Sequence, residues 1–144
     1  MPKAEPGACV YGQHLLLRLG SVELQPVLDN PAEVAAFLSG LVALVGMRVL
    51  AGPYVATEDT DPARYGHSGV VILYESHAAI HTYPRRRELF LDIFSCRPFA
   101  TDCVLQACRE HFGEHEVLEC TLLDRGQHWS LPGLARLQEW MPSS

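Results

Sequence analysis

The residue types that can do chemistry gather between residues 67 and 96. Nucleophiles, bases and acids are spaced there among apolar, strand-like segments: His67, Ser68, Glu75, Ser76, His77, His81, Asp92 and Cys96. A Ser or His between strands is most often a turn residue or a hydrogen-bonded core group, and that reading suits any one of them taken alone. Their concentration at the ends of strand-like segments favours a functional site.

One chemistry open to this window is metal binding. Histidine and cysteine are the usual ligands of zinc, and four are available: His67, His77, His81 and Cys96. His77 and His81 stand four residues apart, which places both side chains on one face of a strand as well as of a helix. The window has no His-Glu-x-x-His signature, so we expect no metal.

A second possibility is a Cys–His hydrolase. Cys96 would be its nucleophile, His81 the base and Asp92 the group that orients the base. A small protein with a Cys and several His residues readily admits this reading, so the pattern is weak.

A third possibility is cleavage of the backbone at a serine. This chemistry needs a hydroxyl pressed against the preceding carbonyl in a strained turn, with a base nearby. Glu75 and Ser76 lie at such a junction between two predicted strands. Ser68 and His81 could converge on it, so spacing permits this reading without deciding between the three.

Strand-like and helix-like segments surround the window. Asn30, Pro31 and Glu33 form a typical helix start. The predicted helices cover 31–45 and 100–112, and the predicted strands cover 13–19, 47–56, 69–74, 78–83, 88–95 and 116–123. Strands that run consecutively between two helices predict an α+β fold: a two-layer α/β sandwich in which an antiparallel-rich sheet carries both helices on one face. The open face would need a partner, which predicts a homodimer.

Composition narrows the class of protein. The chain has 144 residues, enough for one domain, and a net charge of −6, which argues against nucleic acid as a partner. Five cysteines without a Cys-x-x-Cys pair argue against a disulfide framework. No apolar stretch approaches the roughly 20 residues that cross a bilayer, so we expect a cytoplasmic protein with no membrane partner.

Four ordered motifs then resemble one known family, the short prokaryotic S-adenosylmethionine decarboxylases. The resemblance is carried by Ser-Gly-Val-Val-Ile at 68–72, Glu-Ser-His at 75–77, Ile-His-Thr-Tyr-Pro at 80–84 and Asp-Ile-Phe-Ser-Cys at 92–96, with Gly-Gln-His-Leu-Leu at 12–16 similar to the family's opening strand. It extends over roughly residues 11–126. We therefore expect a family domain at 1–126 and a C-terminal extension at 127–144 with a short helix in its tail.

The resemblance implies a self-processing, pyruvoyl-dependent decarboxylase. Ser76 would attack the carbonyl of Glu75, and elimination would give chains 1–75 and 76–144, the second beginning with a covalent pyruvoyl group. Ser68 and His81 match the positions that assist processing, and Cys96 matches the proton donor. The pyruvoyl carbonyl would form a Schiff base with the substrate and accept electrons as CO₂ leaves. The family dimerises through its sheet, which would give four layers, αββα.

The substrate is where the sequence departs from the family pattern. Arg85 follows Pro84 where members that act on S-adenosylmethionine usually have a Glu that holds the ribose hydroxyls. Tyr83, and Tyr65 in the altered loop before Ser68, are candidates for the aromatic contacts to adenine. We expect decarboxylated S-adenosylmethionine for spermidine and polyamine synthesis as the product. The alternatives are L-ornithine or L-arginine as substrate, or a non-catalytic relative.

Overall fold

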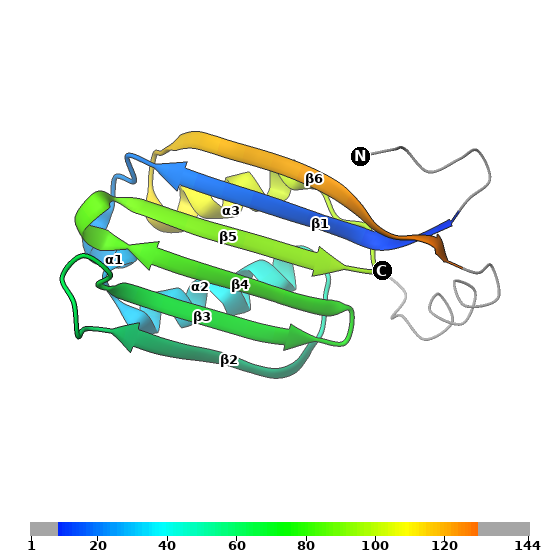
Figure 1. Cartoon of the computed structure of the whole chain (residues 1–144), viewed down its shortest axis with the longest axis horizontal. Helices are drawn as coiled ribbons and strands as arrows, with labels where there is room; N and C mark the ends of the chain where they lie inside the picture. Colours follow the sequence, from blue (N-terminus) through cyan, green and yellow to red (C-terminus); the bar gives the residue numbers. More distant parts are fainter. Residues whose placement is uncertain (1–8, 130–144) are drawn as a thin grey trace.

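One antiparallel sheet of six strands forms the body of the protein, in a computed structural model that describes residues 9–129. The strand order is β2-β3-β4-β5-β1-β6, with every neighbouring pair antiparallel. The elements are β1 (Cys9–Gly20), α1 (Gln25–Leu28), α2 (Pro31–Leu44), β2 (Val49–Glu58), β3 (Gly66–Leu73), β4 (Ser76–Tyr83), a 3₁₀ turn (Pro84–Arg86), β5 (Glu88–Ser95), α3 (Thr101–Phe112) and β6 (Glu116–Trp129). The helices lie on one face of the sheet (Figure 1). The predicted two-layer α+β sandwich is confirmed.

The predicted first helix begins where its capping sequence indicates. Asn30 is extended, and its side-chain oxygen accepts a hydrogen bond from the backbone N–H of Ala32 at 2.9 Å, with Pro31 as the first helical residue. The helix ends before Gly46, which has a φ of +72°. Its buried stripe packs on the sheet and reaches α3 through Phe37, whose ring centroid lies 4.8 Å from that of Phe112.

The core lies between the sheet and the helices because strand residues alternate between two faces. In β5, Leu89, Leu91 and Ile93 are buried beneath the helices. Phe90, on the opposite face, is 40% exposed. In the part of the chain that the structure describes, this opposite, open face carries no second layer, although apolar side chains stand on it.

Several boundaries differ from the prediction, and two of the differences bear on the site. β4 begins at Ser76 and not at residue 78, so the hairpin from β3 turns tightly at Tyr74 and Glu75. β6 continues to Trp129, past the predicted end at 123, because it pairs along the whole length of β1. The short helix expected in the tail lies outside the described residues.

Candidate functional site

The hairpin between β3 and β4 fixes the side chain of Glu75. This carboxyl group is fully buried. It accepts hydrogen bonds from the backbone N–H of Arg48 at 2.9 Å and from Nε of Arg48 at 3.5 Å. A buried charge persists only when it is paired and hydrogen-bonded. Arg48, just before β2, therefore anchors the residue that precedes Ser76.

Ser76 has a backbone conformation that L-amino acids rarely adopt. Its φ is +151°, and it is one of three non-glycine residues with positive φ in the described chain. Such a conformation costs on the order of 1–3 kcal/mol and persists only where surrounding structure imposes it. Pairing with Ser95 and the buried Glu75 supply that constraint. The strain lies at the bond that the sequence predicts to break.

The carbonyl oxygen of Glu75 accepts a hydrogen bond from the backbone N–H of Cys96 at 3.0 Å. A donor aimed at a carbonyl oxygen stabilises the negative charge that develops when a nucleophile attacks the carbon. Gly12 makes this arrangement possible, because a Cβ at that position would stand 2.1 Å from the carbonyl oxygen of Ser95 and 2.8 Å from Cα of Cys96. The strand end that holds Cys96 thus packs directly against the backbone of β1.

The thiol of Cys96 is suited to hold a proton. The side chain is buried at 6% exposure, and burial raises the pKa of the thiol. A hydrogen bond with Tyr11 works in the opposite direction, and the charge of Glu75 raises the pKa further. A thiol that stays protonated can donate a proton but is a poor nucleophile. This environment does not suit the nucleophile of a hydrolase.

Ser68 and His81 form a second pair of reactive groups. The hydroxyl oxygen of Ser68 lies 2.7 Å from Nδ1 of His81, and the two residues are cross-strand partners in β3 and β4. Both are exposed on the open face of the sheet.

This pair does not converge on Ser76 within one chain. His81 lies five residues beyond Ser76 on the same strand, which at about 3.3 Å per residue is roughly 16 Å. Cys96 adjoins Ser95, the partner of Ser76, so it is also far from His81. The expected convergence is therefore wrong for a single chain, and the same separation excludes a Cys96–His81 hydrolase pair within one chain.

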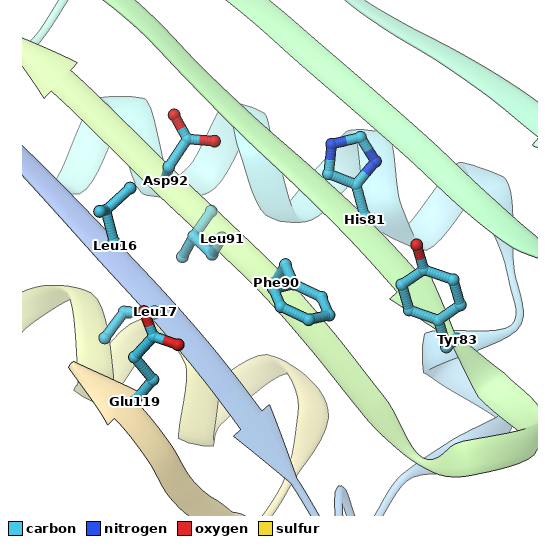
Figure 2. Close-up of a pocket in the computed structure, with 8 residues that line it drawn as sticks. All are labelled: Leu16, Leu17, His81, Tyr83, Phe90, Leu91, Asp92 and Glu119. Atoms are coloured by element: carbon cyan, nitrogen blue, oxygen red, sulfur yellow. The ribbon is translucent and has the colours of Figure 1, made fainter. Parts of the chain in front are cut away.

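A pocket of about 420 Å³ opens on the face that carries His81. It is lined by Leu16, Leu17, His81, Tyr83, Phe90, Leu91, Asp92 and Glu119. Figure 2 shows His81 and Tyr83 on β4, Phe90 and Asp92 on β5, and Glu119 across β1 on β6. The rings of Tyr83 and Phe90 meet edge to face, with centroids 6.0 Å apart. The pocket is thus an elongated groove across four strands.

Two of the three predicted substrate-binding residues do not line this pocket. The guanidinium of Arg85 lies 5.2 Å from the ring centroid of Tyr65. The hydroxyl of Tyr65 donates a 2.6 Å hydrogen bond to Asp29, and this bond raises the pKa of Tyr65. Tyr65 and Arg85 therefore form a cluster of their own, and only Tyr83 of the three faces the pocket.

The four residues considered as metal ligands are not brought together. His67 is buried and hydrogen-bonded to Thr57 at 2.9 Å and Asp29 at 3.0 Å, as a core histidine would be. His81 contacts Ser68, and His77 lies near the other end of β4.

A different set, His14, His77 and Asp92, has ligand atoms within 4.8 Å of one another. Both imidazoles contact the same oxygen of Asp92, His14 at 2.9 Å and His77 at 3.2 Å. Arg125 lies 3.2 Å from Nδ1 of His14. Because a guanidinium can only donate, Nδ1 accepts this bond and Nε2 carries the proton that goes to Asp92. A proton on the ligand atom and a fixed positive charge beside it both oppose a cation, and the contacts of this set are those of a hydrogen-bonded cluster.

Comparison with known proteins agrees with the motifs. A family model described as S-adenosylmethionine decarboxylase matches residues 13–126. The chain belongs to this family. One similar member is the S-adenosylmethionine decarboxylase proenzyme of Methanococcus maripaludis (strain C5 / ATCC BAA-1333). It is 33% identical to this chain over 90 residues, which cover 62% of this chain and 69% of that protein. The proenzyme of Sulfurihydrogenibium sp. (strain YO3AOP1) is 31% identical over 85 residues, 59% of each chain.

The family resemblance extends to the fold. The crystal structure of the adenosylmethionine decarboxylase from Aquifex aeolicus superposes with a TM-score of 0.69 at 21% identity, covering 81% of this chain and 92% of that one. The sheet with helices on one face is therefore the fold of an S-adenosylmethionine decarboxylase. Among the described residues, no helix is long and apolar enough to span a membrane.

Proposed function

We propose that this family member is a proenzyme that cuts itself between Glu75 and Ser76. The hydroxyl of Ser76 attacks the carbonyl carbon of Glu75, the bond to the Ser76 nitrogen breaks, and an ester forms. Removal of the Cα proton of Ser76 expels the Glu75 carboxylate, and exchange of the amino group for an oxygen from water releases ammonia and leaves pyruvoyl. The observation that carries this proposal is the 3.0 Å bond from the Cys96 N–H to the Glu75 carbonyl, beside the strained φ of Ser76.

The base for this elimination comes from a second copy of the chain. His81 is the candidate because Ser68 lies 2.7 Å from its Nδ1. Roughly 16 Å of strand separates His81 from Ser76 within one chain. Packing of the open faces of two copies, in four layers αββα, would place Ser68 and His81 of one copy over Ser76 of the other. Apolar side chains exposed on that face support such packing, with Phe90 40% and Ile72 41% exposed.

In the processed enzyme the pyruvoyl group supplies the electron sink for loss of CO₂ from an amino acid bound through its amine. Cys96 adjoins Ser95, the strand partner of Ser76. Burial raises the pKa of its thiol, so the thiol keeps a proton to donate to the carbon that loses CO₂. The protein is therefore proposed to be a pyruvoyl-dependent carboxy-lyase.

The leading substrate is S-adenosylmethionine, and the product would enter spermidine synthesis. The relatives' names support this assignment. One observation favours a second candidate, L-ornithine or L-arginine: Arg85, at the position of the expected ribose-binding Glu, offers no acceptor to a diol and stacks on Tyr65. Release of CO₂ from each of the three compounds by processed protein separates these candidates.

A complementation experiment tests the shared site. Ser76→Ala and His81→Ala chains with different tags are each expected to remain uncut when expressed alone. When they are coexpressed, the His81→Ala chain should be cut, because it keeps Ser76 and can borrow His81 from its Ser76→Ala partner. Failure of both chains to cut in the mixture, with dimers present, would contradict a site shared between copies.

A further inference from the structure

The charged side chains that line the pocket are acidic, apart from the imidazole of His81. Asp92 and Glu119 supply carboxylates, and the remaining lining residues are aliphatic or aromatic. A carboxylate beside apolar walls attracts a positive charge, because the interaction is screened less there than in open water.

The two carboxylates differ in the partners that they already contact. Asp92 contacts His14 at 2.9 Å and His77 at 3.2 Å. Glu119 has no ion pair within the described part of the chain. Its strand partner Arg18 lies on the same open face but bonds Glu88 on β5, at 2.8 Å. Glu119 is therefore the pocket carboxylate that remains available to a ligand.

Aromatic rings complete a surface suited to a cation. Phe90 is exposed on the floor of the groove and Tyr83 meets it at 6.0 Å. Ring faces attract cations that lie within about 6 Å of the centroid. The guanidinium of Arg18 lies 5.7 Å from the Phe90 centroid, and its charge is balanced by Glu88 at 2.8 Å. Arg85 is stacked on Tyr65 and is not part of the lining.

We propose that Glu119 determines specificity by binding the positively charged end of the substrate, a sulfonium or a terminal ammonium or guanidinium. The proposal rests on the decarboxylase function proposed above. His81 on β4 and Glu119 on β6 are separated by three strand spacings, about 14 Å. The groove in Figure 2 therefore suits an elongated molecule whose cation lies far from the end near His81.

The test compares the wild-type chain with Glu119→Gln, which keeps the size and removes the charge. Asp124→Asn is the matched control, since Asp124 lies on the same strand as Glu119 but pairs with Gln13 and does not line the pocket. Calorimetric binding is measured for S-adenosylmethionine, ornithine and arginine, and for their uncharged counterparts S-adenosylhomocysteine, norvaline and citrulline. KM and kcat follow for each cation that releases CO₂, and a sizing column follows the oligomeric state.

We expect the wild type and Asp124→Asn to bind one of the three cationic compounds more tightly than its neutral counterpart. The compound preferred shows whether Glu119 binds a sulfonium, an ammonium or a guanidinium. Glu119→Gln should lose this preference and raise KM roughly 10- to 100-fold, the range expected when one partner of a charged interaction is neutralised, with kcat, chain cleavage and oligomeric state unchanged. An unchanged preference in Glu119→Gln, or an equal loss in Asp124→Asn, would overturn the proposal. Failure of the decarboxylase function itself would appear separately, as an uncut chain that releases no CO₂, while the binding measurements still decide the role of Glu119.

Discussion

The Ser76→Gly variant should be more stable than the Ser76→Ala variant. This is the reverse of the usual effect, because an alanine-to-glycine change in a strand normally destabilises a protein. The φ of Ser76 is +151°, a region open to glycine but costly for residues with a Cβ. Ser76→Ala and Ser76→Gly both lack the hydroxyl, so both remain uncut and can be compared directly. Relief of strain is worth about 1–3 kcal/mol, and glycine gives back roughly 0.5–1 kcal/mol of backbone entropy. The net expectation is a gain of about 0.5–2 kcal/mol for Ser76→Gly over Ser76→Ala.

The assay is thermal unfolding of the two uncut variants at equal concentration. A gain of this size corresponds to a melting temperature about 2–6 °C higher for Ser76→Gly. Ala79→Gly supplies the control, because Ala79 lies in the same strand, is paired on both sides and does not have positive φ. It should lower the melting temperature. If Ser76→Gly unfolds below Ser76→Ala by as much as the control falls, the backbone at residue 76 is not strained.

Other residues around the cut give further predictions. Glu75→Ala should slow cleavage about 10- to 100-fold, because loss of the bonds to Arg48 removes roughly 1.5–3 kcal/mol of interaction that holds residue 75 in place. A time course of chain cleavage on gels measures this rate. An unchanged rate would contradict the role of Arg48 in anchoring Glu75. Cys96→Ser keeps the backbone N–H, so cleavage should continue while CO₂ release falls; arrest of cleavage would show that the thiol acts in processing. Burial raises the pKa of Cys96, so its alkylation by iodoacetamide should keep accelerating with pH beyond the range where a free cysteine levels off, and a plateau at or below that range would refute the assigned environment.

Local sequence rules predicted the elements well. The alternation in 88–95 identified the buried and open faces of β5, and Asn30 with Pro31 identified the start of α2. Both signals arise within a few residues, where strand and helix periodicity act directly. The four-residue helix α1 is too short for such a pattern and was not predicted.

Features that depend on distant pairing were harder to predict. Glu119 lines the pocket because β6 pairs with β1, a pairing between the two ends of the domain. The residues next to Glu119 in the sequence carry no signal that predicts this pairing. Phe90 could have been found, since its alternation with the buried Leu89 and Leu91 places it on the open face. The separation of Ser76 and His81 could also have been predicted. Both residues lie on one extended strand, and five residues of a strand span roughly 16 Å.

The mass of the purified full-length chain tests the central claim most directly. Self-processing predicts two chains, each about half of the 16.0 kDa total, cut between Glu75 and Ser76. The second chain should be lighter by one ammonia than a simply hydrolysed fragment, because pyruvoyl replaces the amino-terminal serine. A single intact chain of 16.0 kDa, or a cut that leaves an ordinary serine at residue 76, would contradict the pyruvoyl mechanism.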